Sequence, residues 1–230
     1  MINIYPSREL FLEKAAHGNV IPVYGEFVAD TETPVSAFKK VGGMPYSFLL
    51  ESVEGGETVG RYSFVGTGPR LVVRAKNESV EISHPDGRVE RTTSPQPLDA
   101  LRQVMRQYRF VADTDLPPFC GGAVGYVSYD AVRYLENIGS SAVDDLGLPD
   151  LYFMITDTVL IFDHVRHRLQ ILSNAVVDDT ISADEAYDQA VSKIHALREK
   201  LRAPLPPPTP AAPAASGPGR AASPGGCSRG

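Results

Sequence analysis

Residues 151–174, LYFMITDTVLIFDHVRHRLQILSN, decide the fold class. β-Branched and aromatic residues dominate this stretch, which predicts two long strands, 151–163 and 167–173, around a turn at His164–His167. Helical patterns flank it on both sides. Long antiparallel strands with helices between them predict an α+β domain built on a mostly antiparallel sheet or half β-sandwich with flanking helices.

The remaining elements follow from caps and periodicity. Thr33 before Pro34, with Gly42 beyond the end, predicts a short helix. Ser182 and Glu185 form a capping box before a long helix with one apolar face. Asp86-Gly87 predicts a hairpin turn. Further strands are expected at 20–27, 46–52, 61–66, 70–76, 79–83, 88–93 and in the Gly-rich stretch from 121, and further helices at 7–18 and 97–108.

Composition excludes several classes of protein. Hydrophobic residues make up 43% of the 230-residue chain and the net charge is −6, which argues against nucleic-acid binding. No apolar run is long enough for a membrane span, and the first residues lack the pattern of a signal peptide. Cys120 and Cys227 are too few for a disulfide framework. We therefore expect a reduced, cytoplasmic protein that binds neither nucleic acid nor membrane.

The composition changes at Arg202. Residues 203–230 are rich in Pro, Ala and Gly and contain no Asp, Glu, Val, Ile or aromatic residue. Such a segment buries too little apolar surface to offset the entropy of ordering. The predicted division is a folded domain at 1–202 and a disordered tail at 203–230.

No familiar nucleophile, zinc-protease or phosphate-loop motif occurs in the sequence. We interpret His164 and His167 as solvated turn residues, because no further metal ligand is near them in sequence. The glycines of GGAVGYVSY (121–129) are interpreted as points of close backbone approach. Tyr126, Tyr129, Arg133 and Tyr134 can line a pocket, although aromatic packing is the commoner explanation.

One polar pair stands out, in LLES at 49–52. On an alternating strand Glu51 and Ser52 point to opposite faces. In the simplest interpretation, Ser52 begins a turn and Glu51 is solvated. In the alternative, the strand end holds a ligand.

The sequences ETPVSAFKKV (32–41), YSFLLESVEGGETVGRYSFVG (46–66) and GGAVGYVSYDAVRYLENI (121–138) resemble the N-terminal region of anthranilate synthase component I. The resemblance covers roughly residues 5–202. In that family, the region packs on a chorismate-binding catalytic domain. The complete enzyme makes anthranilate from chorismate, with Mg²⁺ and ammonia from a glutaminase subunit, component II. Aminodeoxychorismate synthase component I is similar but matches less closely.

The resemblance implies an allosteric tryptophan site at Leu50, Glu51 and Ser52. The carboxylate suits the ammonium group of L-tryptophan and the apolar strand suits its indole ring. Arg61, at the start of the returning strand, can lie near this ligand or pair with Glu51.

The catalytic residues of the family lie in its C-terminal domain, to which nothing in this sequence corresponds. A shifted reading frame or a truncated gene would explain why the Pro-, Ala- and Gly-rich tail at 203–230 stands where the family has its catalytic domain. We therefore expect no catalytic residue, no bound cofactor and no activity from the chain alone. A stand-alone amino-acid-binding module and a glutaminase-docking module remain open alternatives.

Overall fold

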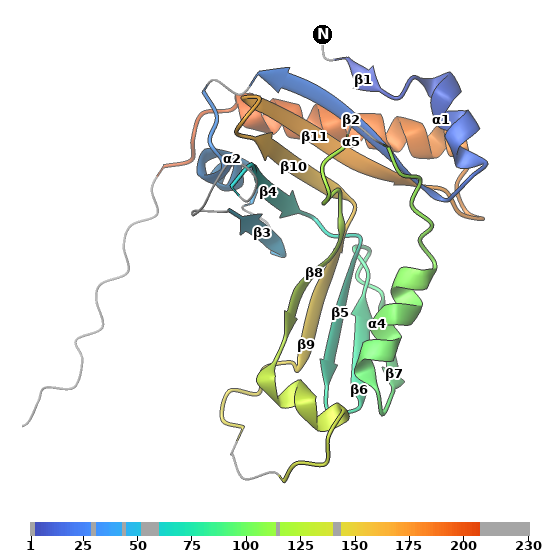
Figure 1. Cartoon of the computed structure of the whole chain (residues 1–230), viewed down its shortest axis with the longest axis vertical. Helices are drawn as coiled ribbons and strands as arrows, with labels where there is room; N and C mark the ends of the chain where they lie inside the picture. The colour runs from blue at the N-terminus through green and yellow to red at the C-terminus, as the bar shows by residue number, and fades with distance from the viewer. Residues whose placement is uncertain are drawn as a thin grey trace, which may run out of the picture.

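The computed structural model describes residues 3–28, 31–42, 45–51, 60–113, 116–139 and 144–207. It contains two antiparallel sheets with a small number of helices, so the predicted α+β class is confirmed. Figure 1 shows one sheet with its helices in the upper part of the molecule and the other sheet extending below it. The predicted disorder of the tail falls mostly on residues 208–230, which lie outside the described residues and leave that prediction untested.

The upper sheet has six strands in the order β1-β2-β11-β10-β4-β3. Strand β10 lies near its centre and pairs with β11 on one side and β4 on the other. Strand β3 lies at an edge and pairs with β4. The bounds are β1 Ile4–Tyr5, β2 Val20–Val28, β3 Ser47–Leu50, β4 Tyr62–Thr67, β10 Thr158–Asp163 and β11 Arg168–Val176.

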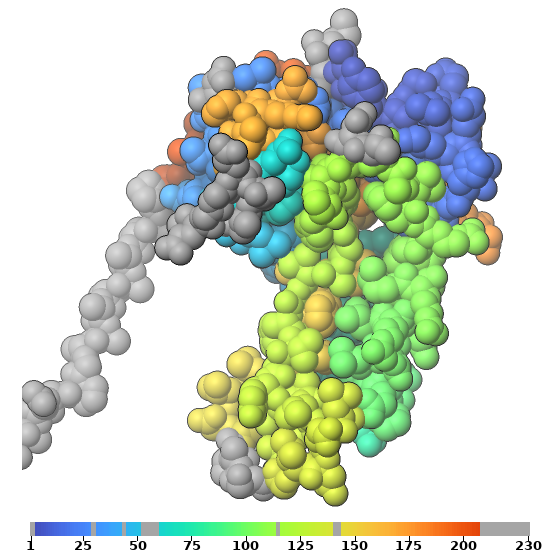
Figure 2. Space-filling model, in the orientation of Figure 1, coloured from blue at the N-terminus to red at the C-terminus, as the bar shows by residue number. Residues whose placement is uncertain are grey.

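The lower sheet has five strands in the order β7-β6-β5-β9-β8. Helix α4 packs against it through a cluster that includes Val104 and Val80. In Figures 1 and 2 this sheet and α4 form a narrower lobe below the upper sheet. The bounds are β5 Leu71–Lys76, β6 Ser79–Ser83, β7 Val89–Thr93, β8 Gly122–Val127, β9 Leu151–Thr156, α4 Pro97–Arg106 and the 3₁₀ helix η1 Tyr129–Tyr134.

The prediction of one strand over 151–163 is wrong, because the chain divides it at Asp157 into β9 and β10, which belong to different sheets. The Asp157 carboxylate is buried, and it accepts hydrogen bonds from Thr158 Oγ1 at 2.8 Å and Lys193 Nζ at 2.8 Å. Its backbone oxygen accepts from Asn174 N at 2.7 Å. These polar contacts fix the point at which the chain passes between sheets.

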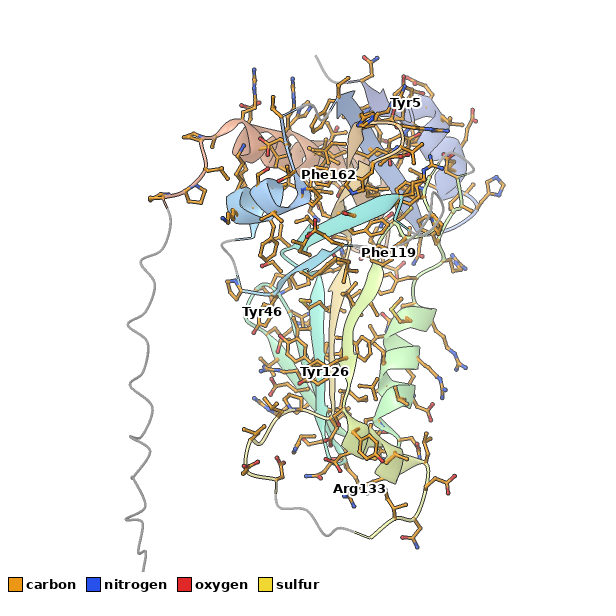
Figure 3. The ribbon with its side chains drawn as sticks, turned by 60° about the vertical axis from the view of Figure 1, so that its left-hand side comes forward. Tyr5, Tyr46, Phe119, Tyr126, Arg133 and Phe162 are labelled. Atoms are coloured by element: carbon orange, nitrogen blue, oxygen red, sulfur yellow. The ribbon has the colours of Figure 1, made fainter. Side chains whose placement is uncertain are left out.

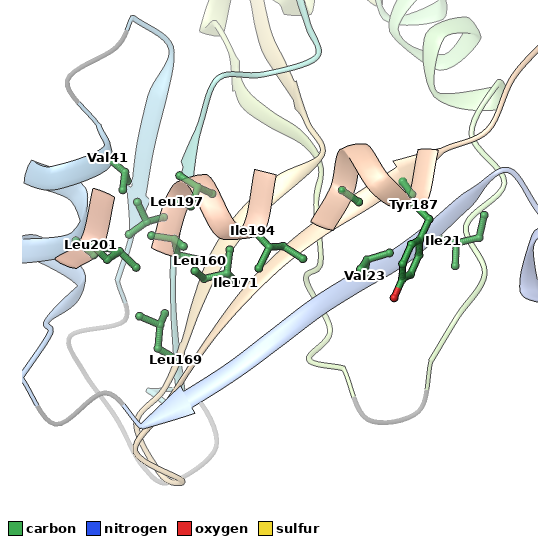
Figure 4. Close-up of a cluster of buried hydrophobic side chains, with 14 of the residues drawn as sticks. Ile21, Val23, Val41, Leu160, Leu169, Ile171, Tyr187, Ile194, Leu197 and Leu201 are labelled. Atoms are coloured by element: carbon green, nitrogen blue, oxygen red, sulfur yellow. The ribbon is translucent and has the colours of Figure 1, made fainter. Parts of the chain in front are cut away.

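Helices α1 (Arg8–Ala15), α2 (Pro34–Val41) and α5 (Ala183–Arg202) contribute to a core on one face of the upper sheet. The predicted caps at Thr33 and Ser182 are confirmed, since each accepts a hydrogen bond from a backbone N–H in the first turn, and Ser7 caps α1 in the same way. Figure 4 shows the apolar side of α5 against β2, β10 and β11. The predicted apolar face of this helix is confirmed, since its residues are all buried, namely Tyr187, Ala190, Ile194, Leu197 and Leu201.

The opposite face of the upper sheet is lined by aromatic residues at its junction with the lower sheet. Phe119, labelled in Figure 3 at this junction, packs edge-on against Phe64 with ring centroids 5.1 Å apart. Phe48 of β3 joins a small cluster with Val72 and Met154 of the lower sheet. The two sheets therefore share buried contacts as well as strand connections.

Candidate functional site

The predicted ligand site begins at the end of edge strand β3. Leu50 is the last residue of β3, pairs with Phe64 of β4 and is 44% exposed. Alternation places Leu50 on the same face as Phe48, which is the aromatic face, whereas Leu49 packs into the core beneath the helices. Glu51 follows and is exposed. Ser52 lies outside the described residues, so its place at this site stays a prediction.

Arg61, the fourth residue of the predicted site, is held by Asp163 of the neighbouring strand β10. Its Nη2 lies 2.7 Å from Asp163 Oδ2 and its Nε lies 3.2 Å from each carboxylate oxygen. The guanidinium also lies 4.8 Å from the ring centroid of Tyr62. In the structure the carboxylate that pairs with Arg61 is that of Asp163 and not that of Glu51.

Asp163 organises the turn between β10 and β11. Its Oδ1 accepts hydrogen bonds from the backbone N–H groups of Val165 at 3.1 Å and Arg166 at 3.0 Å. Burial alone would raise the pKa of Asp163, but the hydrogen bonds from Arg61 and from these backbone groups outweigh it and hold the pKa below the ordinary 3.8. The ionised carboxylate of Asp163 therefore holds Arg61, which directly precedes β4, in place.

We expect Asp163→Asn to lower the free energy of unfolding modestly at pH 7. Asparagine keeps an oxygen for the turn but loses the charge that holds Arg61. Because the folded pKa of Asp163 is depressed, its contribution is present above the ordinary carboxyl pKa and disappears as pH falls through the folded pKa. Urea unfolding of both proteins should show a difference at pH 7 that shrinks below about pH 4. A difference that stays constant across this range would contradict the ion pair.

The histidines of the turn are exposed, as predicted. His164 Nε2 lies 2.8 Å from Ser63 Oγ, and His167 adopts a φ of 51°. Within the described part of the chain, no three His, Cys, Asp or Glu side chains gather in a way that could hold a metal ion.

The tyrosines in and after the Gly-rich strand β8 mainly pack against neighbours and hold a loop in place. Tyr126 stacks on Tyr152 at 5.9 Å, and Tyr134 donates to Asp150 Oδ2 at 2.5 Å. Burial and this hydrogen bond raise the pKa of the Tyr134 phenol above its ordinary value. Tyr126, Arg133 and Tyr134 line a groove, whereas Tyr129 is 92% exposed.

Sequence reasoning missed a second hollow, between the two sheets, in which Cys120 and Asn174 lie. The Cys120 thiol donates to Pro117 O at 3.0 Å, and burial raises its pKa to about 11, so it is no nucleophile at neutral pH. No sequence motif marks this hollow, because its walls come from strands and loops far apart in the chain.

Comparison with known proteins identifies a family model and several proteins that are similar to this chain. The family model described as chorismate binding enzyme matches residues 45–220. The chain is 38% identical over 197 residues to anthranilate synthase component 1 of Acetivibrio thermocellus, covering 86% of this chain and 39% of that protein. It is 40% identical over 207 residues to anthranilate synthase component 1 of a Synechocystis species, covering 89% of this chain and 41% of that protein.

A solved structure agrees with these matches. The crystal structure of anthranilate synthase component I from Streptococcus pneumoniae superposes with a TM-score of 0.52 at 25% identity, covering 78% of this chain and 37% of that one. The chain thus spans about two fifths of the length of the curated relatives that it matches.

No helix among the described residues is both long and apolar enough to cross a membrane.

Proposed function

Since this chain belongs to the chorismate binding enzyme family, we propose that residues 1–202 form the tryptophan-responsive N-terminal region of an anthranilate synthase component I. The observation that carries this proposal is the pattern of the matches. Relatives with that name match 86–89% of this chain, yet the match covers only 39–41% of their own length. This pattern suits a regulatory region that works with a larger catalytic part.

In this proposal, the catalytic part converts chorismate to anthranilate and pyruvate with Mg²⁺. Ammonia comes from a glutaminase subunit, component II, in a cytoplasmic complex. L-Tryptophan, the end product of the pathway, binds the region described here and lowers the rate. The described residues supply the effector site and no catalytic group.

The strand end of β3 has the chemistry that tryptophan needs. Leu50 is exposed and lies beside Phe64 on the aromatic face, where an indole ring can pack. The exposed carboxylate of Glu51 can pair with the ammonium group of the amino acid. Arg61 already has a carboxylate partner in Asp163, so we assign it to holding β4 in place and not to the ligand.

A chimera tests the proposal. Residues 1–202 of this chain would be joined to the part of the Acetivibrio thermocellus relative that the match does not cover. We expect the chimera to form fluorescent anthranilate from chorismate, ammonia and Mg²⁺, and L-tryptophan to inhibit it. The 230-residue chain alone should form none above a no-protein control. Anthranilate formation by the chain alone, or an active chimera insensitive to tryptophan, would refute the assignment.

A further inference from the structure

Edge strand β3, whose end carries the proposed effector site, has few hydrogen bonds to hold it in place. It spans only Ser47–Leu50, and among the described strands it pairs with β4 alone. A short strand at the edge of a sheet depends on side-chain packing to keep its position. The side chains that reach from β3 to the lower sheet therefore influence where Leu50 and Glu51 lie.

Phe48 is the first of these side chains. Its ring lies across β4 at Gly66, since a Cβ built on Gly66 would lie 2.2 Å from Phe48 Cε1. The ring packs with Val72 of β5 and Met154 of β9, and it is buried. Phe48 is therefore a core residue that attaches the middle of β3 to the lower sheet.

Tyr46, which directly precedes β3, makes a second contact with the lower sheet. Its ring centroid lies 6.4 Å from that of Tyr152 in β9, and Tyr152 stacks on Tyr126 of β8 at 5.9 Å. Burial and the nearby phenol of Tyr46 raise the pKa of the Tyr152 phenol above its ordinary value. Figure 3 shows Tyr46 where the two sheets meet and Tyr126 below it on the lower sheet. The three rings thus form a row from the start of β3 onto two strands of the lower sheet.

The backbone of Tyr46 adopts a conformation that does not suit a tyrosine. Its φ is 66°, in the left-handed region that bulky residues seldom adopt, and the residue is 41% exposed. Asn77 and His167 also have positive φ, but they lie in the hairpin turns after β5 and β10. A glycine would adopt the φ of Tyr46 without strain. A strained and half-exposed tyrosine indicates that its ring has a role other than filling the core.

From these observations we propose that Tyr46 is a positioning residue for the effector site. Its contact with Tyr152 fixes the start of β3 on the lower sheet, and thereby the place of Leu50 and Glu51 at the other end of the strand. Without the ring, β3 keeps its pairing with β4 and its Phe48 contact but moves more freely over the lower sheet. A ligand that needs one position of the strand then binds more weakly, in proportion to the molecules that have that position. The link to tryptophan rests on the proposed function, whereas the positioning of β3 does not.

The positioning is tested on the full chain with Tyr46→Gly, followed by hydrogen exchange. Glycine removes the ring but also relieves the left-handed backbone, so the urea midpoint should stay close to that of the parent. The protected amides of β3 should exchange about two- to ten-fold faster, which is the change in an equilibrium that one aromatic pair is worth. Amides of β10 and β11 should keep the parent rate, and Tyr46→Phe, which retains the ring, should keep it throughout. Unchanged exchange of β3 in Tyr46→Gly would overturn the positioning role.

The link to the effector is tested by inhibition of the chimera. The L-tryptophan concentration for half inhibition should rise about two- to ten-fold in Tyr46→Gly and stay at the parent value in Tyr46→Phe. Asn77→Gly is the matched control, because it makes the same kind of change at a φ of 51° and should leave inhibition unchanged. Faster exchange of β3 with unchanged inhibition would overturn the link to the effector. A parent chimera insensitive to tryptophan would instead refute the proposed function, and the exchange rates would still decide the positioning.

A second variant keeps the test decisive if Tyr46→Gly fails to fold. Tyr152→Leu keeps an apolar side chain beside the Phe48 cluster but offers no ring to Tyr46. We expect it to speed the exchange of β3 and weaken inhibition in the same way. Combining both substitutions should add nothing further, because each removes the same contact. Parent behaviour of Tyr152→Leu, or fully additive effects of the two changes, would overturn the contact as the cause.

Discussion

Replacing Ser52 with Phe is expected to abolish inhibition of the chimera by L-tryptophan while leaving anthranilate formation close to the parent rate. Ser52 directly follows Glu51 at the proposed effector site, and a phenyl ring there would occupy the space of the ligand. The catalytic part of the chimera is unaltered, so its chemistry should continue. The activity should therefore stay flat at tryptophan concentrations that inhibit the parent almost completely.

The control for this prediction is Ser79→Phe. Ser79 is an exposed residue at the start of β6 in the lower sheet, so the same ring should leave inhibition unchanged. If Ser52→Phe remains as sensitive as the parent, Ser52 is a turn residue and the effector site lies elsewhere.

Replacing Gly125 with Ala is expected to destabilise the fold strongly. A Cβ at this position of β8 would lie 1.8 Å from Tyr152 O and 2.7 Å from Phe153 Cα. Both atoms are backbone of the neighbouring strand β9, so no side-chain rotation relieves the clash. Overpacking that shifts the backbone typically costs about 1–3 kcal/mol of unfolding free energy and occasionally more, and we expect Gly125→Ala at the upper end of this range. Urea unfolding of the parent and of Gly125→Ala at neutral pH measures this loss of unfolding free energy.

Gly139→Ala is the matched control, because a Cβ there meets no described atom within 4 Å. We expect it to unfold at nearly the same urea concentration as the parent. If Gly125→Ala were equally harmless, β8 would not approach β9 as closely as the structure shows.

The features that the sequence predicts correctly depend on residues that are close together in the chain. The side chains of Thr33 and Ser182 reach backbone N–H groups three residues away, so their caps depend on neighbours in sequence. The Asp86-Gly87 turn has its glycine at a φ of 88°, a conformation that favours this residue. The close approach predicted for the Gly-rich strand is confirmed at Gly121 and Gly125, but it is wrong at Gly122, where an added Cβ would meet no atom within 4 Å.

The features that the sequence does not predict depend on contacts between residues that are far apart in the chain. Arg61 and Asp163 lie 102 positions apart, so nothing local distinguishes this partner from the nearer Glu51. The division at Asp157 depends on Lys193 of α5 and on the backbone of Asn174. The polar triplet 156–158 that separates the two apolar runs contains no Gly or Pro, so the sequence shows no clear boundary between two sheets.

The most direct test of the central claim is calorimetric titration of L-tryptophan into the chimera and into its Glu51→Gln variant. Glutamine keeps the shape of the side chain but removes the charge that pairs with the ammonium group. Losing a charged hydrogen bond weakens binding by about ten-fold or more. Glu78→Gln, an exposed change between β5 and β6, should bind like the parent. The account predicts weak or undetectable binding by Glu51→Gln alone, and equal affinity of Glu51→Gln and the parent would contradict it.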